Sequence, residues 1–335
     1  MIHSLSAKVT SPKTIEVIKV NLPKLKDSQV LLRVLSCGVC SSEIPVYTGE
    51  VIGTPGASFR YKDYPADIGH EVVGEVIEIG SKVKGIDLGS FVTGLTYSGC
   101  GFSEYFIEEA KALVTLSSTD RHKCSKIIGE PLMATVNIIR QMQVGFGDSI
   151  VVVGDGFMSL LLIAGLSRYP ISHLIVVGHH ENRLNIAKKY GATHCINSKN
   201  EDPWEIIMEQ TSGIGTDISV EYAGNTKTLQ LAASICKAKQ RSKLVLASAY
   251  PNDQAFAIGN YLQNRAPVLI PAYPNHSPNP MADMRQGIWG YENGIFPIDE
   301  LITNQYPLKK ITGAFEDCIN RRDHYIKGIV TPHLL

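Results

Sequence analysis

The 335-residue chain lacks several features that would assign it to particular classes of protein. Lys plus Arg equals Asp plus Glu at 32 each, so no net positive field attracts a nucleic-acid backbone. The N-terminus has no signal-peptide apolar region, and no uninterrupted apolar run is long enough to span a membrane. Seven cysteines, an odd number in a long chain, do not form the pattern of a disulfide framework. We expect a cytoplasmic protein with reduced thiols that binds neither nucleic acid nor membrane.

The chain divides into regions with two different patterns of predicted secondary structure. QVLLRVLS (29–36) and HEVVGEVIEIGS (70–81) are β-branched runs bounded by turn-forming residues, which predicts strands in the first third. From about Gly129 strands and helices alternate, which is typical of a parallel sheet. After the Pro-rich stretch PVLIPAYPNHSPNP (267–280) shorter mixed elements return. We predict an α/β fold in which a Rossmann doubly wound parallel-sheet domain (131–268) is inserted into a β-rich domain (1–130 and 269–335).

The stretch GDGFMS lies between a predicted strand and a predicted helix, where a dinucleotide fingerprint must lie. Its first glycine permits a tight turn, and its second lets the backbone approach a pyrophosphate at the helix N-terminus. Ser159 occupies the third position and is small enough for close helix–strand packing. An ordinary tight turn is the alternative, but the strand and helix on either side favour a cofactor. The expected cofactor-binding residues here are Gly154, Asp155, Gly156, Phe157 and Met158.

The end of the next predicted strand, VVGHHENR (176–183), lacks the Asp or Glu that usually holds a ribose 2′-hydroxyl. Gly178 stands in the acidic place, and His179, His180 and Arg183 follow. Without the carboxylate a 2′-phosphate is not repelled, and the basic cluster is able to pair with it. A solvated helix start with a chance histidine pair is the alternative. We predict NADP as the cofactor, with NAD as the second choice, and the missing acid weighs against a methyltransferase.

Three motifs carry a family resemblance: CGVCSSE (37–43), GHEVVGEV (69–76) and GEPLMATVN (129–137). Together with the inserted nucleotide domain they resemble the zinc-dependent medium-chain alcohol and polyol dehydrogenases, in the branch similar to sorbitol dehydrogenase. The similarity covers nearly the whole chain. It implies a GroES-like fold for the β-rich domain.

The resemblance implies one catalytic zinc ion, held by Cys40, His70 and Glu130. Glu71 is then an exchangeable ligand or a close neighbour, and Cys37 a buried bystander, so the choice between Glu71 and Glu130 as third ligand stays open. Zinc accepts thiolate, imidazole and carboxylate together, and a catalytic site keeps one position open. A redox pair or a zinc knuckle is the alternative for C-x-x-C. The family's four-cysteine structural zinc lobe is missing from the sequence.

The implied reaction is reversible hydride transfer between an alcohol carbon and a nicotinamide. Ser42 matches the residue that takes the alcohol proton, and Glu43 stands where the family has an Asp that orients the ligand histidine. Pro45 replaces a histidine that completes the proton relay in many members, so the proton's exit route stays open. The glutamate ligand weakly favours a secondary alcohol, polyol or cyclitol-like substrate. Four residues in and just before loop 49–65 are candidates to line the substrate cleft, with a plain surface position as the alternative: Tyr47, Phe59, Arg60 and Tyr61.

Two alternative functions would require only part of this site. One is a zinc-free medium-chain reductase for quinones or enoyl esters, which normally lacks the ligand set. The other is a non-catalytic NADP(H)-binding sensor or structural protein, which has no need of Ser42. For assembly, PVLIPAY (267–273) reads as an edge strand able to pair across a two-fold axis, which predicts a homodimer or homotetramer.

Overall fold

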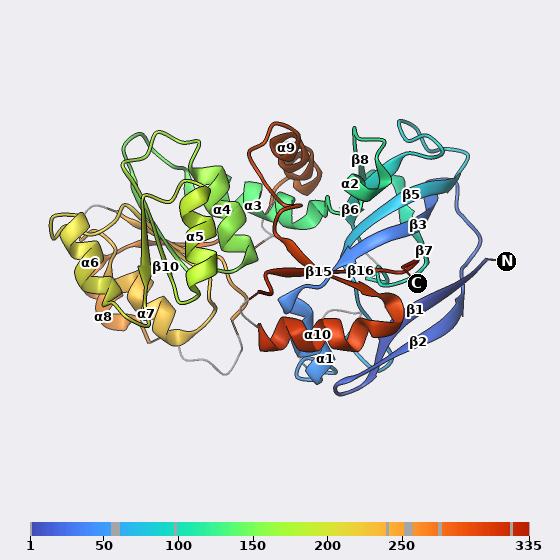
Figure 1. Ribbon diagram of the computed structural model, residues 1–335, viewed down its shortest axis with the longest axis horizontal. Helices are drawn as coiled ribbons and strands as arrows, with labels where there is room; N and C mark the ends of the chain where they lie inside the picture. Colours follow the sequence, from blue (N-terminus) through green and yellow to red (C-terminus); the bar gives the residue numbers. More distant parts are fainter. Residues whose placement is uncertain are drawn as a thin grey trace. The chain divides into compact units, whose positions relative to one another are not determined.

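The computed structural model describes residues 2–54, 61–96, 99–238, 241–250, 257–273, 277–321 and 324–334. The chain forms two compact units, one made of Met1–Leu132 and Ile298–Leu335 and the other of Met133–Pro297 (Figure 1). The return to the first unit thus begins at Ile298, whereas the sequence placed it at residue 269. The reason is α9 (Pro280–Glu292), whose Asp283 pairs at 2.8 Å with Arg140 inside the second unit.

The second unit is a six-stranded parallel sheet in the order β11-β10-β9-β12-β13-β14, which confirms the predicted Rossmann fold. Its strands are β9 (Ser149–Val153), β10 (His173–Gly178), β11 (His194–Asn197), β12 (Ile218–Glu221), β13 (Lys243–Leu246) and β14 (Val268–Pro271). Its helices, besides α9, are α4 (Phe157–Leu166), α5 (Glu181–Lys189), α6 (Pro203–Gln210), α7 (Thr226–Ser234) and α8 (Gly259–Arg265). The strand order reverses between β9 and β12, so the crevice for a ligand opens at the carboxyl end of β9.

Burial on both faces explains the sequence of this sheet. All five residues of β9, SIVVV, are buried, as expected for a central parallel strand. Val151 and Val153 share a core cluster with Ile207 of α6 and Leu229 of α7, and α4 and α5 lie side by side against the sheet (Figure 1). Helix starts are set locally: the Asp202 side chain accepts hydrogen bonds from two amides at the start of α6.

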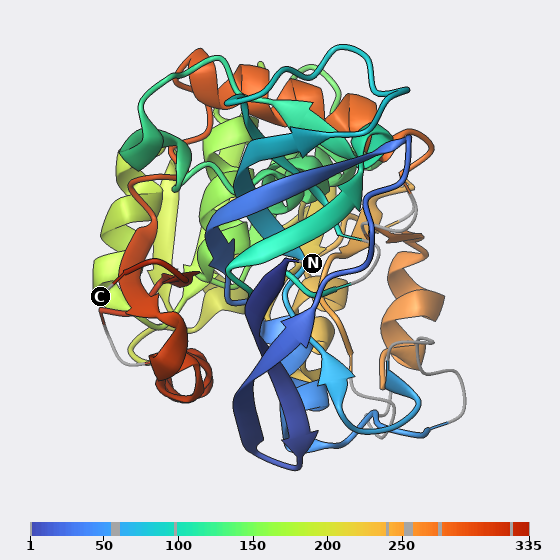
Figure 2. The ribbon, with the colours of Figure 1, turned by 90° about the vertical axis from the view of Figure 1, so that its right-hand side faces the viewer.

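The first unit is β-rich and contains a three-stranded sheet, β2-β1-β4, and a seven-stranded sheet, β15-β16-β3-β5-β6-β8 with β7 paired to β3 (Figure 2). The strands of the smaller sheet are β1 (His3–Ser11), β2 (Thr14–Asn21) and β4 (Ala66–Asp67). Those of the larger sheet are β3 (Gln29–Gly38), β5 (Glu71–Ile79), β6 (Phe91–Leu95), β7 (Tyr105–Glu109), β8 (Leu113–Thr115), β15 (Ile302–Pro307) and β16 (Lys327–Thr331). The helices are η1 (Ser41–Glu43), α1 (Ile44–Thr48), η3 (Ala110–Ala112), α2 (Arg121–Cys124), η5 (Leu308–Lys310) and α10 (Ile311–Asn320), and α3 (Gly129–Met142) leads into the second unit.

Strand β16 brings the end of the chain back to its beginning. It pairs antiparallel with β3, Ile329 opposite Gly38 and Val330 opposite Cys37. The same end of β3 pairs with β5, Cys37 opposite Val72. The last residues of β3 therefore lie between the first residues of β5 and of β16, and this junction positions the candidate metal centre.

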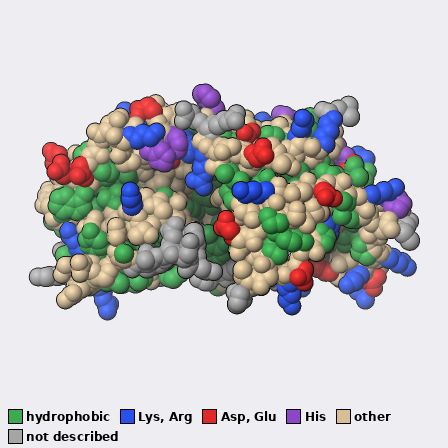
Figure 3. Space-filling view, turned by 90° about the horizontal axis from the view of Figure 1, so that it is seen from below, with side chains coloured by type: hydrophobic (Ala, Val, Ile, Leu, Met, Phe, Trp, Pro, Cys, Tyr) green, Lys and Arg blue, Asp and Glu red, His purple; other side chains and the backbone are tan. Residues whose placement is uncertain are grey.

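The surface agrees with the even charge balance. On the face drawn in Figure 3, side chains of both signs are interspersed with apolar ones. Among the described helices, none is long and apolar enough to cross a membrane.

Candidate metal centre and cofactor site

The two cysteines of CGVC have different surroundings. Cys37 is fully buried in the hydrophobic core, and burial raises the pKa of its thiol well above the usual value. Cys40 lies beyond the end of β3, is only half-buried, and accepts a hydrogen bond from the Ser42 hydroxyl at 3.2 Å. Pro45 is in the first turn of α1, a place where the missing N–H costs nothing. The geometry therefore presents Cys40 and leaves Cys37 to packing.

Glu43 holds the histidine of the GHE motif in place. Its carboxylate is 1% exposed, and one oxygen accepts hydrogen bonds from the Gly69 amide at 2.7 Å and from His70 Nδ1 at 2.9 Å. Because Nδ1 is occupied, Nε2 is the nitrogen left for a metal. Burial lowers the pKa of His70, but the charges of Glu43 and Cys40 raise it more, so its pKa lies well above the usual value.

The next residue, Glu71, makes a buried ion pair with Lys327 of β16 at 2.7 Å. Burial lowers the pKa of Lys327, but the Glu71 carboxylate raises it above the usual value. A Cβ atom at Gly38 would lie 1.8 Å from Glu71 Oε2, so a side chain there would force the Glu71 carboxylate to move. One donor atom each from Cys40, His70 and Glu71 lie within 4.8 Å of one another.

Glu130 comes close to this group without joining it. It lies in the first turn of α3, where the Gly129 amide donates to Thr93 Oγ1 at 2.9 Å. Burial raises the pKa of Glu130 to about 7, with Glu71 contributing in the same direction and His70 opposing. Among the described residues, the trio within 4.8 Å contains Glu71 where the expected ligand set had Glu130.

This donor set fits a zinc ion. Zinc takes thiolate, imidazole and carboxylate ligands together. The centre contains three carboxylates, Glu43, Glu71 and Glu130, and one buried ammonium group, that of Lys327, so this group alone does not bring their charges into balance. A divalent cation would supply that balance. Sequence reasoning missed Lys327, because no local motif marks a residue 256 positions from its partner.

The loop residues considered for the substrate cleft divide between the core and the undescribed part of the chain. Tyr47 is 3% exposed and packs on Phe315 with ring centroids 5.3 Å apart, so it is a core residue. Tyr61 is half-buried against the same core. Phe59 and Arg60 lie outside the described residues.

The GDG turn of the second unit lies between β9 and α4, as a dinucleotide fingerprint requires. Gly154 has φ +130° and its N–H donates to Val177 O at 2.8 Å, while an added Cβ would lie 3.1 Å from the Tyr222 carbonyl carbon. At Gly156, the N-cap of α4, an added Cβ meets nothing within 4 Å, so the backbone is open to a ligand. Phe157 and Ser159 are buried, and Met158 is half-buried.

Asp155 reaches across to the end of β10. Its Oδ2 accepts hydrogen bonds from the amides of His179 and His180, both at 2.8 Å. A Cβ atom at Gly178 would lie 2.6 Å from that oxygen, so the carboxylate fills the space next to a strand end that lacks a side chain. Burial raises the pKa of Asp155, but these amides and the His180 ring lower it below its usual value.

The basic residues after Gly178 do not share one environment. His180 Nδ1 lies 3.1 Å from Asp155 Oδ2, and Arg183, 3% exposed, lies 3.6 Å from Oδ1. His179 is exposed. Asp155, His179 and His180 are close enough to hold a metal ion, but the Arg183 guanidinium 3.3 Å from His180 Nδ1 opposes a second cation. The sequence feature that could have indicated this arrangement is an aspartate in the GDG turn, Asp155, combined with a glycine, Gly178, at the end of the next strand.

Comparison with known proteins identifies the family of the chain. A model of the alcohol dehydrogenase GroES-like domain matches residues 26–137, and a model of the zinc-binding dehydrogenases matches residues 158–278. Sorbitol dehydrogenase of Bacillus subtilis is 24% identical over 361 residues, covering 98% of this chain and 97% of that protein. L-threonine 3-dehydrogenase of Pyrococcus furiosus is 26% identical over 328 residues, covering 90% and 91%. A Sinorhizobium meliloti protein assigned as a zinc-binding dehydrogenase, solved with NADP bound, has a TM-score of 0.82 at 21% identity and covers 99% of this chain and 100% of that one.

A Rossmann unit joined to a GroES-like unit that presents a thiol, an imidazole and a carboxylate defines a metal-dependent dehydrogenase. The chain belongs to the zinc-binding medium-chain dehydrogenase family, as a zinc-dependent enzyme that uses NAD(P) and acts on alcohols. The family resemblance and fold class predicted from the sequence are thereby confirmed.

The glycine opposite Glu71 gives the first prediction. Gly38→Ala forces the Glu71 side chain away from Lys327, because the new methyl group would overlap the carboxylate. Breaking a buried ion pair costs about 3 kcal/mol or more, so the free energy of unfolding in urea should fall by that amount. Gly313→Ala, in α10 where an added Cβ meets nothing within 4 Å, is the matched control and should change stability by less than about 1 kcal/mol. Equal stability of both variants would show that Gly38 does not protect the pair.

Glu130 gives a pH-dependent prediction for metal-free protein. Its folded pKa of about 7 lies above the ordinary 4.5, so its contribution to stability is full below the unfolded pKa and disappears as pH rises through about 7. Glu130→Gln does not titrate. Between pH 5 and pH 8, EDTA-treated wild type should lose about 2 to 3 kcal/mol of unfolding free energy relative to this variant. Parallel urea-unfolding profiles across that range would contradict the prediction, and added zinc should reverse the slope.

Proposed function

We propose that the protein is an NADP-dependent oxidoreductase that interconverts a secondary alcohol, polyol or cyclitol-like substrate and the matching ketone or aldehyde. The observation that carries this proposal is the meeting of Cys40, His70 and Glu71 at the junction of β3 and β5. The similar proteins support the substrate class: sorbitol is a polyol, and position 3 of threonine carries a secondary hydroxyl. Three glutamates near the centre make it polar, which suits a hydroxylated substrate.

In this proposal Cys40 and His70 hold the metal together with the carboxylates of Glu71 and Glu130. When bound, zinc supplies a Lewis acid for the substrate oxygen. Glu43 fixes the tautomer and orientation of His70 through Nδ1. Lys327 limits the freedom of Glu71 by pairing with it, and the third protein ligand is supplied by Glu71 or by Glu130.

Ser42 is the residue proposed to take the substrate proton. Its hydroxyl lies 3.2 Å from Cys40 Sγ, so it is next to the metal position, and its side chain is exposed. Exposure gives the proton a direct path to water. Pro45, which has no titratable group, is then no obstacle to the relay, because a histidine at that point is not required.

NADP is supported by the second unit. The end of β10 carries no acidic residue of its own, and Asp155, the carboxylate beside it, is already bonded to the protein. The similar Sinorhizobium meliloti structure contains NADP. The cofactor would lie with its pyrophosphate at the open backbone of Gly156.

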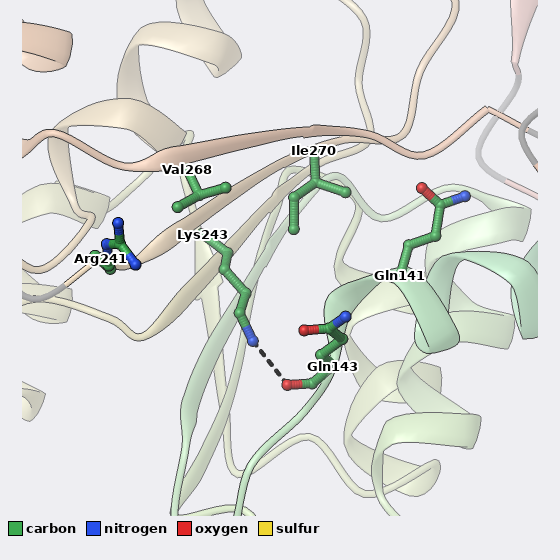
Figure 4. Close-up of a pocket in the computed structure, with 6 residues that line it drawn as sticks. All are labelled: Gln141, Gln143, Arg241, Lys243, Val268 and Ile270. Carbon is green, nitrogen blue, oxygen red and sulfur yellow. Dashed lines mark hydrogen bonds between the residues drawn. The ribbon is translucent and has the colours of Figure 1, made fainter.

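We also propose that the enzyme assembles through β14. This strand is the edge of the parallel sheet, and Val268 and Leu269 are 46% and 42% exposed. A groove of about 510 Å³ lies beside this strand. At the groove the Lys243 ammonium group donates a hydrogen bond to the Gln143 carbonyl oxygen (Figure 4). Among the described strands none pairs with the outer side of β14, and an apolar edge of this kind favours pairing with a second copy, giving a homodimer or homotetramer.

The test of the proposed function is metal content measured alongside turnover. Protein purified without chelator should hold about one zinc ion per chain and oxidise secondary alcohols or polyols with NADP. Cys40→Ala should lose zinc and turnover while binding NADPH with unchanged affinity, because the cofactor site lies in the other unit. Ser42→Ala should keep zinc and lose about 10²-fold in kcat. Absence of zinc even after incubation with the metal would favour a zinc-free reductase or a non-catalytic NADP(H)-binding protein.

The assembly proposal is tested by a charge on the edge. Leu269→Lys should shift the sedimenting species from dimer or tetramer to monomer, because a lysine opposes its own copy across a two-fold axis. Leu88→Lys, at a position 66% exposed in the first unit, is the control and should leave the assembly unchanged. A wild-type protein that sediments as a monomer at all concentrations would remove the proposal.

A further inference from the structure

Asp155 has no capacity left for a ribose hydroxyl. It is 4% exposed, and its Oδ2 accepts two backbone N–H groups at 2.8 Å with the His180 ring at 3.1 Å. Its Oδ1 faces the same ring at 3.2 Å and Arg183 at 3.6 Å. A carboxylate with this many donors does not serve as the ribose-binding acid of an NAD enzyme, even though it reaches from the turn after β9 to the end of β10.

Arg183 is equally committed to the protein. Its side chain is 4% exposed and lies against both Asp155 and His180. A guanidinium in this place does not reach a phosphate outside the protein surface without leaving its carboxylate. Leaving would deprive the buried Asp155 carboxylate of its full positive counter-charge, which is costly. The sequence predicts that Arg183 pairs directly with a 2′-phosphate. In the structure Asp155 competes with the phosphate for Arg183.

The charge of Asp155 matters to any phosphate nearby. A 2′-phosphate at the end of β10 carries close to two negative charges, and a bare carboxylate beneath that strand end would repel it. The positive charge of Arg183 offsets the negative charge of Asp155, because the two side chains are in contact and both are buried. Low exposure keeps such a pair from being screened by salt.

Two exposed basic groups remain at the same edge. His179 follows β10 directly, and its side chain is exposed. The chain after β11 is fastened to the same point, since the Ser198 amide and hydroxyl both donate to Gly178 O, at 2.8 and 2.9 Å. Lys199 comes next and is exposed.

We infer that Arg183 favours NADP without touching it: as the buried counter-ion of Asp155 it removes repulsion, while His179 and Lys199 meet the 2′-phosphate. This inference rests on the proposed function, because it specifies how the NADP preference arises. Arg183 is thus a positioning residue, and the specificity-determining contacts belong to His179 and Lys199.

The experiment compares dissociation constants of NADPH and NADH by isothermal titration calorimetry on the full-length enzyme. Arg183→Met should weaken NADPH binding by about tenfold or more and leave NADH binding little changed. The reason is that the Asp155 charge, no longer offset, repels the 2′-phosphate, which NADH lacks. The double variant Asp155→Asn with Arg183→Met should return NADPH binding to within about threefold of wild type. Lys199→Ala should weaken NADPH alone. Arg168→Met, at an exposed arginine of the same unit, is the matched control and should change neither constant.

A double variant as weak for NADPH as Arg183→Met would mean that Arg183 contacts the phosphate directly, and the inference would be overturned. Equal losses for NADPH and NADH would assign Arg183 a merely structural role, with the same consequence. Should Arg183→Met not fold, Asp155→Asn alone decides: the inference requires its preference for NADPH over NADH to rise, and an unchanged ratio refutes it. Wild type that binds NADH as tightly as NADPH overturns the proposed cofactor itself, and this outcome is visible before any variant is made.

Discussion

The buried ion pair between Glu71 and Lys327 is the interaction on which the candidate metal centre depends. It joins residues 256 positions apart at 2.7 Å and ties the last strand of the chain to the first residue of β5. A buried pair of this kind contributes little net stability compared with apolar packing, but the loss of either member is costly. Its main consequence is positional: it fixes Glu71 beside Cys40 and His70, and it requires glycine at position 38.

Buried carboxylates elsewhere in the protein are held in the same way, by donors from the chain itself. Glu43 accepts hydrogen bonds from the Gly69 amide and the His70 ring. Glu221, at the end of β12, accepts from two amides, from the Thr228 hydroxyl and from the Tyr250 hydroxyl. Asp155 accepts from two amides at the end of β10. Each acid replaces lost water with fixed donors, which removes most of the penalty for its burial and makes the surrounding turn rigid.

Local sequence was sufficient for the fold and for part of the site. The apolar run SIVVV before GDG predicted a strand and the turn after it, because both depend on neighbouring residues alone. The CGVC and GHE motifs likewise pointed to Cys40 and His70, which the structure brings together with Glu71. The partnership of Glu71 with Lys327 was not predictable, since it depends on how β16 pairs with β3. The burial of Arg183 was missed for a similar reason: its carboxylate partner precedes it by a strand and a helix.

The two sites treat negative charge in opposite ways, and this difference matches the ligands proposed for them. At the metal centre three glutamates accompany one buried ammonium group, and the pKa of Glu130 is raised mainly by burial, with the charges of Glu71 and Glu43 acting in the same direction. Such a site is incomplete until a cation arrives. At the end of β10 a single aspartate is matched by an arginine, a histidine and two amides, so no negative charge is left to oppose an anion. In the proposed function, the excess of buried acids at one site suits a cation, and the fully paired aspartate at the other site suits a phosphate.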